Sequence, residues 1–291
     1  MATRVAVQSR VRGSAAHDGF LRHHNFRWAK IAGMLSAVAL LVYLLADVSP
    51  RPSGGTWYGY ATGTLSALMI LWLTMLGVRK RAMTRGRWSL KAWTSAHVYL
   101  GLSLIVVATL HTAFDFGWNV HTLAYMLMMV VILSGLFGIG VYSSLPRILS
   151  NNREEATESQ MLEALRSADR QLHDAAQPLD QHHAEMVRMS LEQDPFGGGL
   201  WARLTGRYPG CATRAAQAEI RRETAYRPKL GDDPLEKIDA LLEKKEAILM
   251  RVRRHLRIKA LLEIWLYVHV PMTFALIAAL AAHIVSEFFY W

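Results

Sequence analysis

The chain has 291 residues, of which 52% are hydrophobic, a formal charge of +10 and a single cysteine, Cys211. One cysteine excludes an intrachain disulfide, an iron–sulfur cluster held by several cysteines, and a C-x-x-C-H site for covalent heme. The apolar residues fall into long blocks with the basic residues at their edges, and this segregation favours a membrane protein over a nucleic-acid-binding one. We therefore expect membrane lipid as a partner and no nucleic acid.

Five blocks are long and apolar enough to cross the hydrocarbon core of a bilayer, which takes about 20 residues of helix. They are Ile31–Ala46, Tyr58–Val78, Ser95–Phe116, Val120–Tyr142 and Leu261–Phe289. We expect an all-α integral membrane protein: a five-transmembrane-helix bundle with a helical cytoplasmic insert between helices four and five. The expected parts are a basic N-terminus (1–28), helices one to four (29–145), the insert (146–259) and helix five (260–291).

The basic residues gather at alternate ends of these helices. Before the first block lie Arg4, Arg10, Arg12, Arg22, Arg27 and Lys30. The loop between the second and third blocks carries Arg79, Lys80, Arg81, Arg85, Arg87 and Lys91. Before the fifth block lie Arg251, Arg253, Arg254, Arg257 and Lys259. Cytoplasmic loops carry an excess of Lys and Arg. The pattern predicts a multi-pass protein of the plasma (inner) membrane, with its N-terminus and insert cytoplasmic and its C-terminus outside.

The insert is rich in helix-forming residues. Glu154–Ala176 and Asp233–Lys259 carry apolar residues at helical spacing, and the segments at 195–199 and 208–210 are typical turns. No Gly or Pro interrupts the chain between Pro234 and Pro271, so the last of these helices is expected to continue into helix five. We expect a small helical domain, such as a two-helix coiled hairpin, whose purpose is docking.

Two of the apolar blocks carry histidine pairs with the same spacing. The third reads HVYLGLSLIVVATLH, from His97 to His111, and the fifth reads HVPMTFALIAALAAH, from His269 to His283. Fourteen residues rise about 21 Å along an α-helix and return to within roughly 40° of the starting direction. Each helix therefore presents two imidazoles on nearly one face, one near each membrane surface.

The topology makes the third and fifth blocks parallel, so His97 is expected opposite His269 and His111 opposite His283. Two facing pairs at two depths match the ligands of two non-covalent, bis-histidine hemes b, which suit electron transfer because no coordination position stays open. Small residues on both helices agree with this: Gly101, Ser103, Ala108, Thr109, Ala275, Ala278, Ala279, Ala281 and Ala282. A metal-transport or proton path would need no equal spacing at matched depths.

The four histidines resemble those of the transmembrane domain of the ferric reductase and NADPH oxidase superfamily. In that family the third and fifth helices each carry two heme ligands at about this spacing, and the cytochrome b subunits of respiratory oxidoreductases are similar. The resemblance covers about half the chain and implies a diheme electron-transfer subunit. The chain departs from the family in its long insert and in having no flavin- or nicotinamide-binding domain. This favours a separate cytoplasmic flavoprotein or iron–sulfur subunit as donor, and an outer acceptor or a quinone at the other end.

Four other residues are candidates for contacting the hemes without binding their iron. Arg87, Lys91 and Arg257 are candidates for contacting the propionates of the inner heme, and His121 for lying beside the outer heme, although an interfacial role for His121 is an equal alternative. The polar segments carry further histidines that we expect to be exposed: His23, His24, His173, His182, His183 and His255. The alternative function is a heme-free membrane scaffold or transporter whose insert recruits partners.

Overall fold

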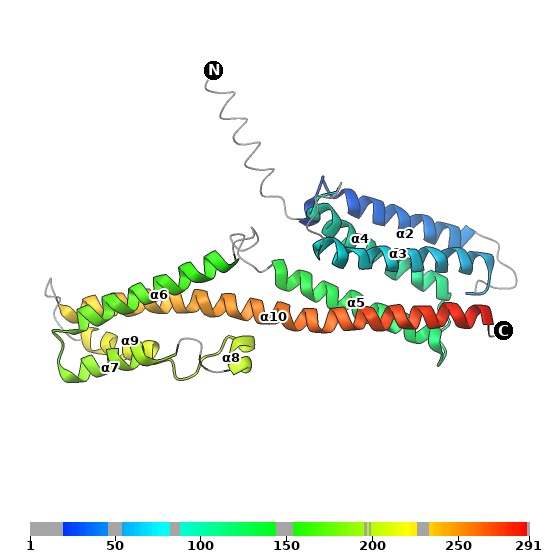
Figure 1. Ribbon diagram of the computed structural model, residues 1–291. Helices are drawn as coiled ribbons and strands as arrows, with labels where there is room; N and C mark the ends of the chain where they lie inside the picture. Colours follow the sequence, from blue (N-terminus) through cyan, green and yellow to red (C-terminus); the bar gives the residue numbers. More distant parts are fainter. Residues whose placement is uncertain are drawn as a thin grey trace, which may run out of the picture. The chain divides into compact units, whose positions relative to one another are not determined.

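The computed structural model describes residues 20–45, 54–81, 88–143, 154–194, 197, 199–225 and 233–289, which contain helices and no strand (Figure 1). In chain order the elements are a short 3-10 turn and nine α-helices within the described ranges: η1 (Phe20–Arg22), α2 (Arg27–Leu45), α3 (Trp57–Arg81), α4 (Leu90–Thr112), α5 (Val120–Ser143), α6 (Glu154–Ala176), α7 (Gln181–Glu192), α8 (Gly199–Thr205), α9 (Ala212–Ala225) and α10 (Pro234–Phe289).

The predicted all-helical class is confirmed, and the described residues contain five helices long and apolar enough to cross a membrane: α2, α3, α4, α5 and α10. The helix α4, which corresponds to the third predicted span, begins and ends a few residues earlier than predicted, and local contacts explain both limits. Ser89 caps α4, because its hydroxyl accepts a hydrogen bond from the backbone N–H of Ala92. Ala113 has φ +47°, a left-handed conformation that ends α4 at Thr112, ahead of the predicted Phe116.

The chain divides into two compact units. The first unit comprises Met1–Leu136 and Val268–Trp291, and the insert unit comprises Phe137–Tyr267. The unit boundaries fall inside α5 and α10, which each contribute residues to both units. The insert unit is wider than the predicted insert at both ends, because it takes in the end of α5 and a longer part of α10.

In the first unit α4 packs closely against α2 and α3, whereas almost no Cα atom of α10 comes within 8 Å of α4. The Tyr58 hydroxyl donates to the Ala39 carbonyl oxygen at 3.1 Å and ties α3 to α2. A buried apolar cluster joins α3, α4, α5 and α10 at mid-height; it includes Leu104, Met128 and Leu276. Leu104 and Leu276 each lie midway along the sequence between their helix's two histidines, so an apolar layer separates the histidine levels.

The last helix is continuous. α10 begins at Pro234, where proline costs no hydrogen bond, and Asp233 caps it by accepting from the Leu235 N–H at 3.0 Å. It runs through Pro271 to Phe289, which confirms the prediction of an unbroken helix from the insert into the fifth apolar block.

The insert unit is more than a two-helix hairpin. α6, α7 and α9 lie along the first half of α10 (Figure 1), and their apolar faces meet in one core: Leu172, Met186, Val187, Ala216, Ile220, Leu235, Ile238 and Leu242. The polar sequence between the predicted helices Glu154–Ala176 and Asp233–Lys259 also contains apolar residues at helical spacing, and these residues form the faces of α7 and α9 that pack into the core. The buried Lys245 ammonium pairs with Asp169 at 2.7 Å and donates to the Ser190 carbonyl oxygen at 2.7 Å.

Candidate functional site

The outer histidine group consists of His111, His283 and His121, from α4, α10 and α5. The ring centres of His111 and His283 lie 6.0 Å apart, with the rings inclined at 68°. His111 Nδ1 is 2.8 Å from the Gly59 carbonyl oxygen on α3. His283 Nδ1 makes a hydrogen bond with His121 Nδ1, and those two ring centres are 4.5 Å apart. The structure thus brings His121 beside the outer pair.

The inner histidine group consists of His97 on α4 and His269 on α10. His97 Nδ1 is 3.0 Å from the Leu73 carbonyl oxygen on α3, and His269 Nδ1 is 2.8 Å from Ser134 Oγ on α5. His269 is close enough to His97 for the two side chains to interact electrostatically. All four predicted ligands are half-buried, so a neighbouring helix holds each ring while part of the ring remains accessible.

In all four imidazoles the Nδ1 nitrogen makes a hydrogen bond. A carbonyl oxygen only accepts hydrogen bonds, so Nδ1 of His97 and of His111 must carry the proton, which leaves Nε2 with its lone pair. Ser134 Oγ donates to the Val131 carbonyl oxygen at 2.8 Å, so it accepts from Nδ1–H of His269 and selects the same tautomer. Metal-bound histidines have this arrangement, because the second nitrogen's hydrogen bond fixes the tautomer and the ring orientation.

Within the described residues, Nε2 of His97, His111 and His283 makes no hydrogen bond. No group of three or more His, Cys, Asp and Glu side chains among these residues is arranged to hold a metal ion. Among the predicted ligands, His111 lies beside His283, and His97 lies near His269. Pairs suit a metal whose remaining ligands come from a planar ring such as a porphyrin.

Two glycines on the helices facing the histidines leave space for the rings. A Cβ atom on Gly63 of α3 would lie 2.7 Å from His111 Cε1, and a Cβ on Gly135 of α5 would lie 3.5 Å from His269 Cε1. The first contact is impossible without movement of the ring, so Gly63 is required for the observed position of His111. The sequence pattern did not single out Gly59, Gly63 or Ser134, although a serine and glycines inside apolar helices are a usable signal of close helix packing.

The remaining predicted residues are dispersed. Lys91 is half-buried in the first turn of α4, and Arg87 lies outside the described residues. Arg257 belongs to the insert unit, where its Nε donates to the Leu204 carbonyl oxygen at 2.9 Å.

The expectation that all histidines of the polar segments are exposed was wrong for three of them: His23 is half-buried, and two others are buried. His183 is 5% exposed and His255 is 8% exposed. Both occupy the apolar face of their helices, three residues from Met186 and Val252 respectively, and this spacing was readable in the sequence.

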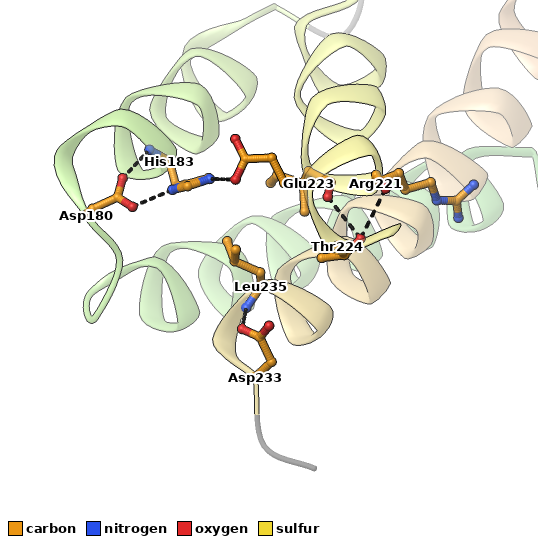
Figure 2. Close-up of polar contacts among 8 residues, drawn as sticks. Asp180, His183, Arg221, Glu223, Thr224, Asp233 and Leu235 are labelled. Atoms are coloured by element: carbon orange, nitrogen blue, oxygen red, sulfur yellow. Dashed lines mark hydrogen bonds and ion pairs between the residues drawn. The ribbon is translucent and has the colours of Figure 1, made fainter. Parts of the chain in front are cut away.

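His183 lies between two carboxylates, as Figure 2 shows. Its Nδ1 is 2.6 Å from Asp180 Oδ2 and its Nε2 is 2.8 Å from Glu223 Oε2, which ties the start of α7 to α9. Burial alone would lower the pKa of His183, but the hydrogen bonds that its ring donates to Asp180 and Glu223 outweigh burial and raise that pKa above its ordinary value. Both ring nitrogens are engaged, so His183 is a structural cation and has no nitrogen left for a metal.

Comparison with protein-family models, with curated proteins and with solved structures finds no match.

Proposed function

We propose that this chain is a membrane diheme cytochrome b that carries electrons between a redox partner on the cytoplasmic side and an outer acceptor or a quinone. His97 and His269 would bind the inner heme, and His111 and His283 the outer one. The observation that carries the proposal is the shared orientation of the histidines: every Nδ1 has a hydrogen-bond partner, and in His97, His111 and His269 that partner leaves the lone pair on Nε2.

The spacing of the outer pair fits such a cofactor. Two imidazoles bound on opposite sides of one metal ion, each through a bond of about 2 Å, hold their ring centres roughly 6 Å apart. The ring centres of His111 and His283 are 6.0 Å apart. The wide backbone separation of α4 and α10 also suits a bulky planar group.

The chain's own residues would set the properties of both centres. Bound heme supplies a one-electron couple at each level. Two imidazoles per iron leave no position for oxygen, and the partners on Nδ1 make the histidines more basic and hold the rings in place. The apolar layer around Leu104 and Leu276 excludes water between the levels.

Membrane insertion is supported by the surfaces of the long helices. Large apolar side chains stay exposed on them, including Leu41 at 57%, Leu44 at 70% and Phe274 at 67%, and such surface is stable against lipid. The positions of the basic residues support a five-span topology with the N-terminus and insert unit in the cytoplasm. The insert unit would then be available to a flavoprotein or an iron–sulfur subunit.

The experiment is a heme count on the full-length protein purified from heme-replete cells. We expect reducible b-type absorption bands and two hemes per chain, one heme in His97→Ala and in His111→Ala, and none in the double variant. The control variant His173→Ala removes an exposed histidine of α6 and should retain both hemes. A colourless wild-type protein, or single variants that retain two hemes, would overturn the proposal in favour of a heme-free scaffold or transporter.

A further inference from the structure

The insert unit contains a cleft of about 500 Å³ lined by five arginines. One wall is the α8–α9 connection at residues 206–209, and Arg214 of α9 adds to it. The other wall is one face of α10, where Met250, Arg253, Arg254 and Arg257 follow at helical spacing. The cleft is as large as those that bind small molecules, which measure roughly 300–1,000 Å³.

Local contacts hold the arginines around this cleft. Gly206 has φ +68°, which favours glycine, and its N–H donates to the Ala202 carbonyl oxygen at 2.8 Å, so the chain turns sharply at the end of α8. The Arg253 guanidinium lies over the Tyr208 ring, 4.2 Å from its centre. Together with the hydrogen bond from Arg257 to the Leu204 carbonyl oxygen, this contact fixes α10 against the connection.

The positive charge of the cleft is largely uncompensated. Arg214 pairs with Glu246 at 2.8 Å. Arg207, Arg254 and Arg257 form no ion pair with any residue in the described part of the chain. Gathering like charges around one cavity costs free energy unless an anion joins them. Elsewhere on the insert unit, Arg188 and Arg221 each meet two carboxylates.

We propose that this cleft is a binding site for a phosphate-bearing anion. Guanidinium groups match phosphate oxygens with paired hydrogen bonds, and several of them around one cavity provide both charge and geometry. Arg257 lies four residues before Leu261, where α10 becomes apolar, so the phosphate has two possible sources: an anionic lipid headgroup or a soluble phosphate compound. The site involves none of the four histidines proposed as heme ligands.

The test is calorimetric titration of the full-length protein in neutral detergent with two probes, inorganic pyrophosphate and short-chain phosphatidic acid. Short-chain phosphatidylcholine serves as the zwitterionic lipid control. Saturable binding of pyrophosphate indicates a soluble ligand, and binding of phosphatidic acid alone indicates a lipid headgroup. Absence of both would overturn the proposal.

The variant Arg207→Gln/Arg254→Gln should weaken binding at least tenfold. It leaves the hydrogen bond of Arg257 and the stacking of Arg253 in place, so folding should be unaffected. The matched control is Arg166→Gln/Arg222→Gln, which removes the same charge from exposed positions on α6 and α9 and should bind as the wild type does. If both variants bound the probes equally weakly, net charge alone would explain the loss of affinity, and the assignment of the binding site to the cleft would be overturned.

Discussion

Two regions of the chain hold histidine side chains at least half-buried and give them opposite kinds of hydrogen-bond partner. In the insert unit, His183 meets carboxylates at both ring nitrogens, at 2.6 and 2.8 Å. In the first unit, the partners of His97, His111 and His269 are carbonyl or hydroxyl oxygens, and each of them holds one nitrogen. The first arrangement stabilises an imidazolium, whereas the second selects the neutral tautomer with its proton on Nδ1.

The difference shows that the hydrogen-bond partners, rather than burial alone, set the chemical role of a histidine. A protonated imidazole has no lone pair and cannot bind a metal. A neutral imidazole whose Nδ1 is already bonded presents Nε2 as a ligand. The predictions below disturb one arrangement at a time, and the other should not respond.

The largest effect is expected from Gly63→Ala. The new methyl group would lie within 3 Å of the His111 ring, at 2.7 Å from Cε1, and would displace it from the outer site. We expect most of the outer heme to be lost and the inner heme to remain, as measured by heme content and by the two reduction potentials. The control is Gly77→Ala on the same helix, where a Cβ meets nothing within 4 Å and both hemes should stay. Equal heme loss in the two variants would contradict the role of Gly63.

An intermediate effect is expected from Ser134→Ala, which removes the acceptor of His269 Nδ1–H. Loss of such a partner typically weakens metal binding by about 10–100-fold, so the inner heme should dissociate faster and its reduction potential should shift. Transfer of heme to an apo-globin acceptor measures the first quantity and a redox titration the second. Ser66→Ala is the control, because the buried Ser66 hydroxyl has no partner among the described residues. A change in the reduction potential of the outer heme alone would contradict the assignment of Ser134 and His269 to the inner heme.

The smallest effect is expected from His183→Gln in the insert unit. The raised pKa of His183 means that its stabilising contribution is fully present below the ordinary value of about 6.5 and is lost as pH rises through the folded-state value. The melting temperature of the wild type should exceed that of the variant below pH about 6.5, and the difference should narrow as the pH rises through the folded-state pKa of His183. His182→Gln removes an exposed neighbour and should reproduce the wild-type profile. If the difference in melting temperature instead widened as the pH rose, the charged form of His183 would be destabilising, and its proposed ion pairs with Asp180 and Glu223 would be contradicted.

The amino-acid sequence determined the features that are periodic or continuous along one helix. The apolar blocks predict the long helices, the absence of breakers between Pro234 and Pro271 predicts the continuity of α10, and the fourteen-residue spacing puts each histidine pair on one helix face. These properties depend on the rise and turn of a single helix, so no tertiary information is needed to read them.

The tertiary structure alone decided which groups from different helices meet. Gly59 and Gly63 of α3 meet His111, Ser134 of α5 meets His269, and Glu223 of α9 meets His183. In the insert unit, the connection between α8 and α9 folds its arginine toward those of α10. Hydrogen bonds and charge interactions act over only a few ångströms, so these contacts depend on how helices distant in sequence pack, which no spacing within one helix specifies.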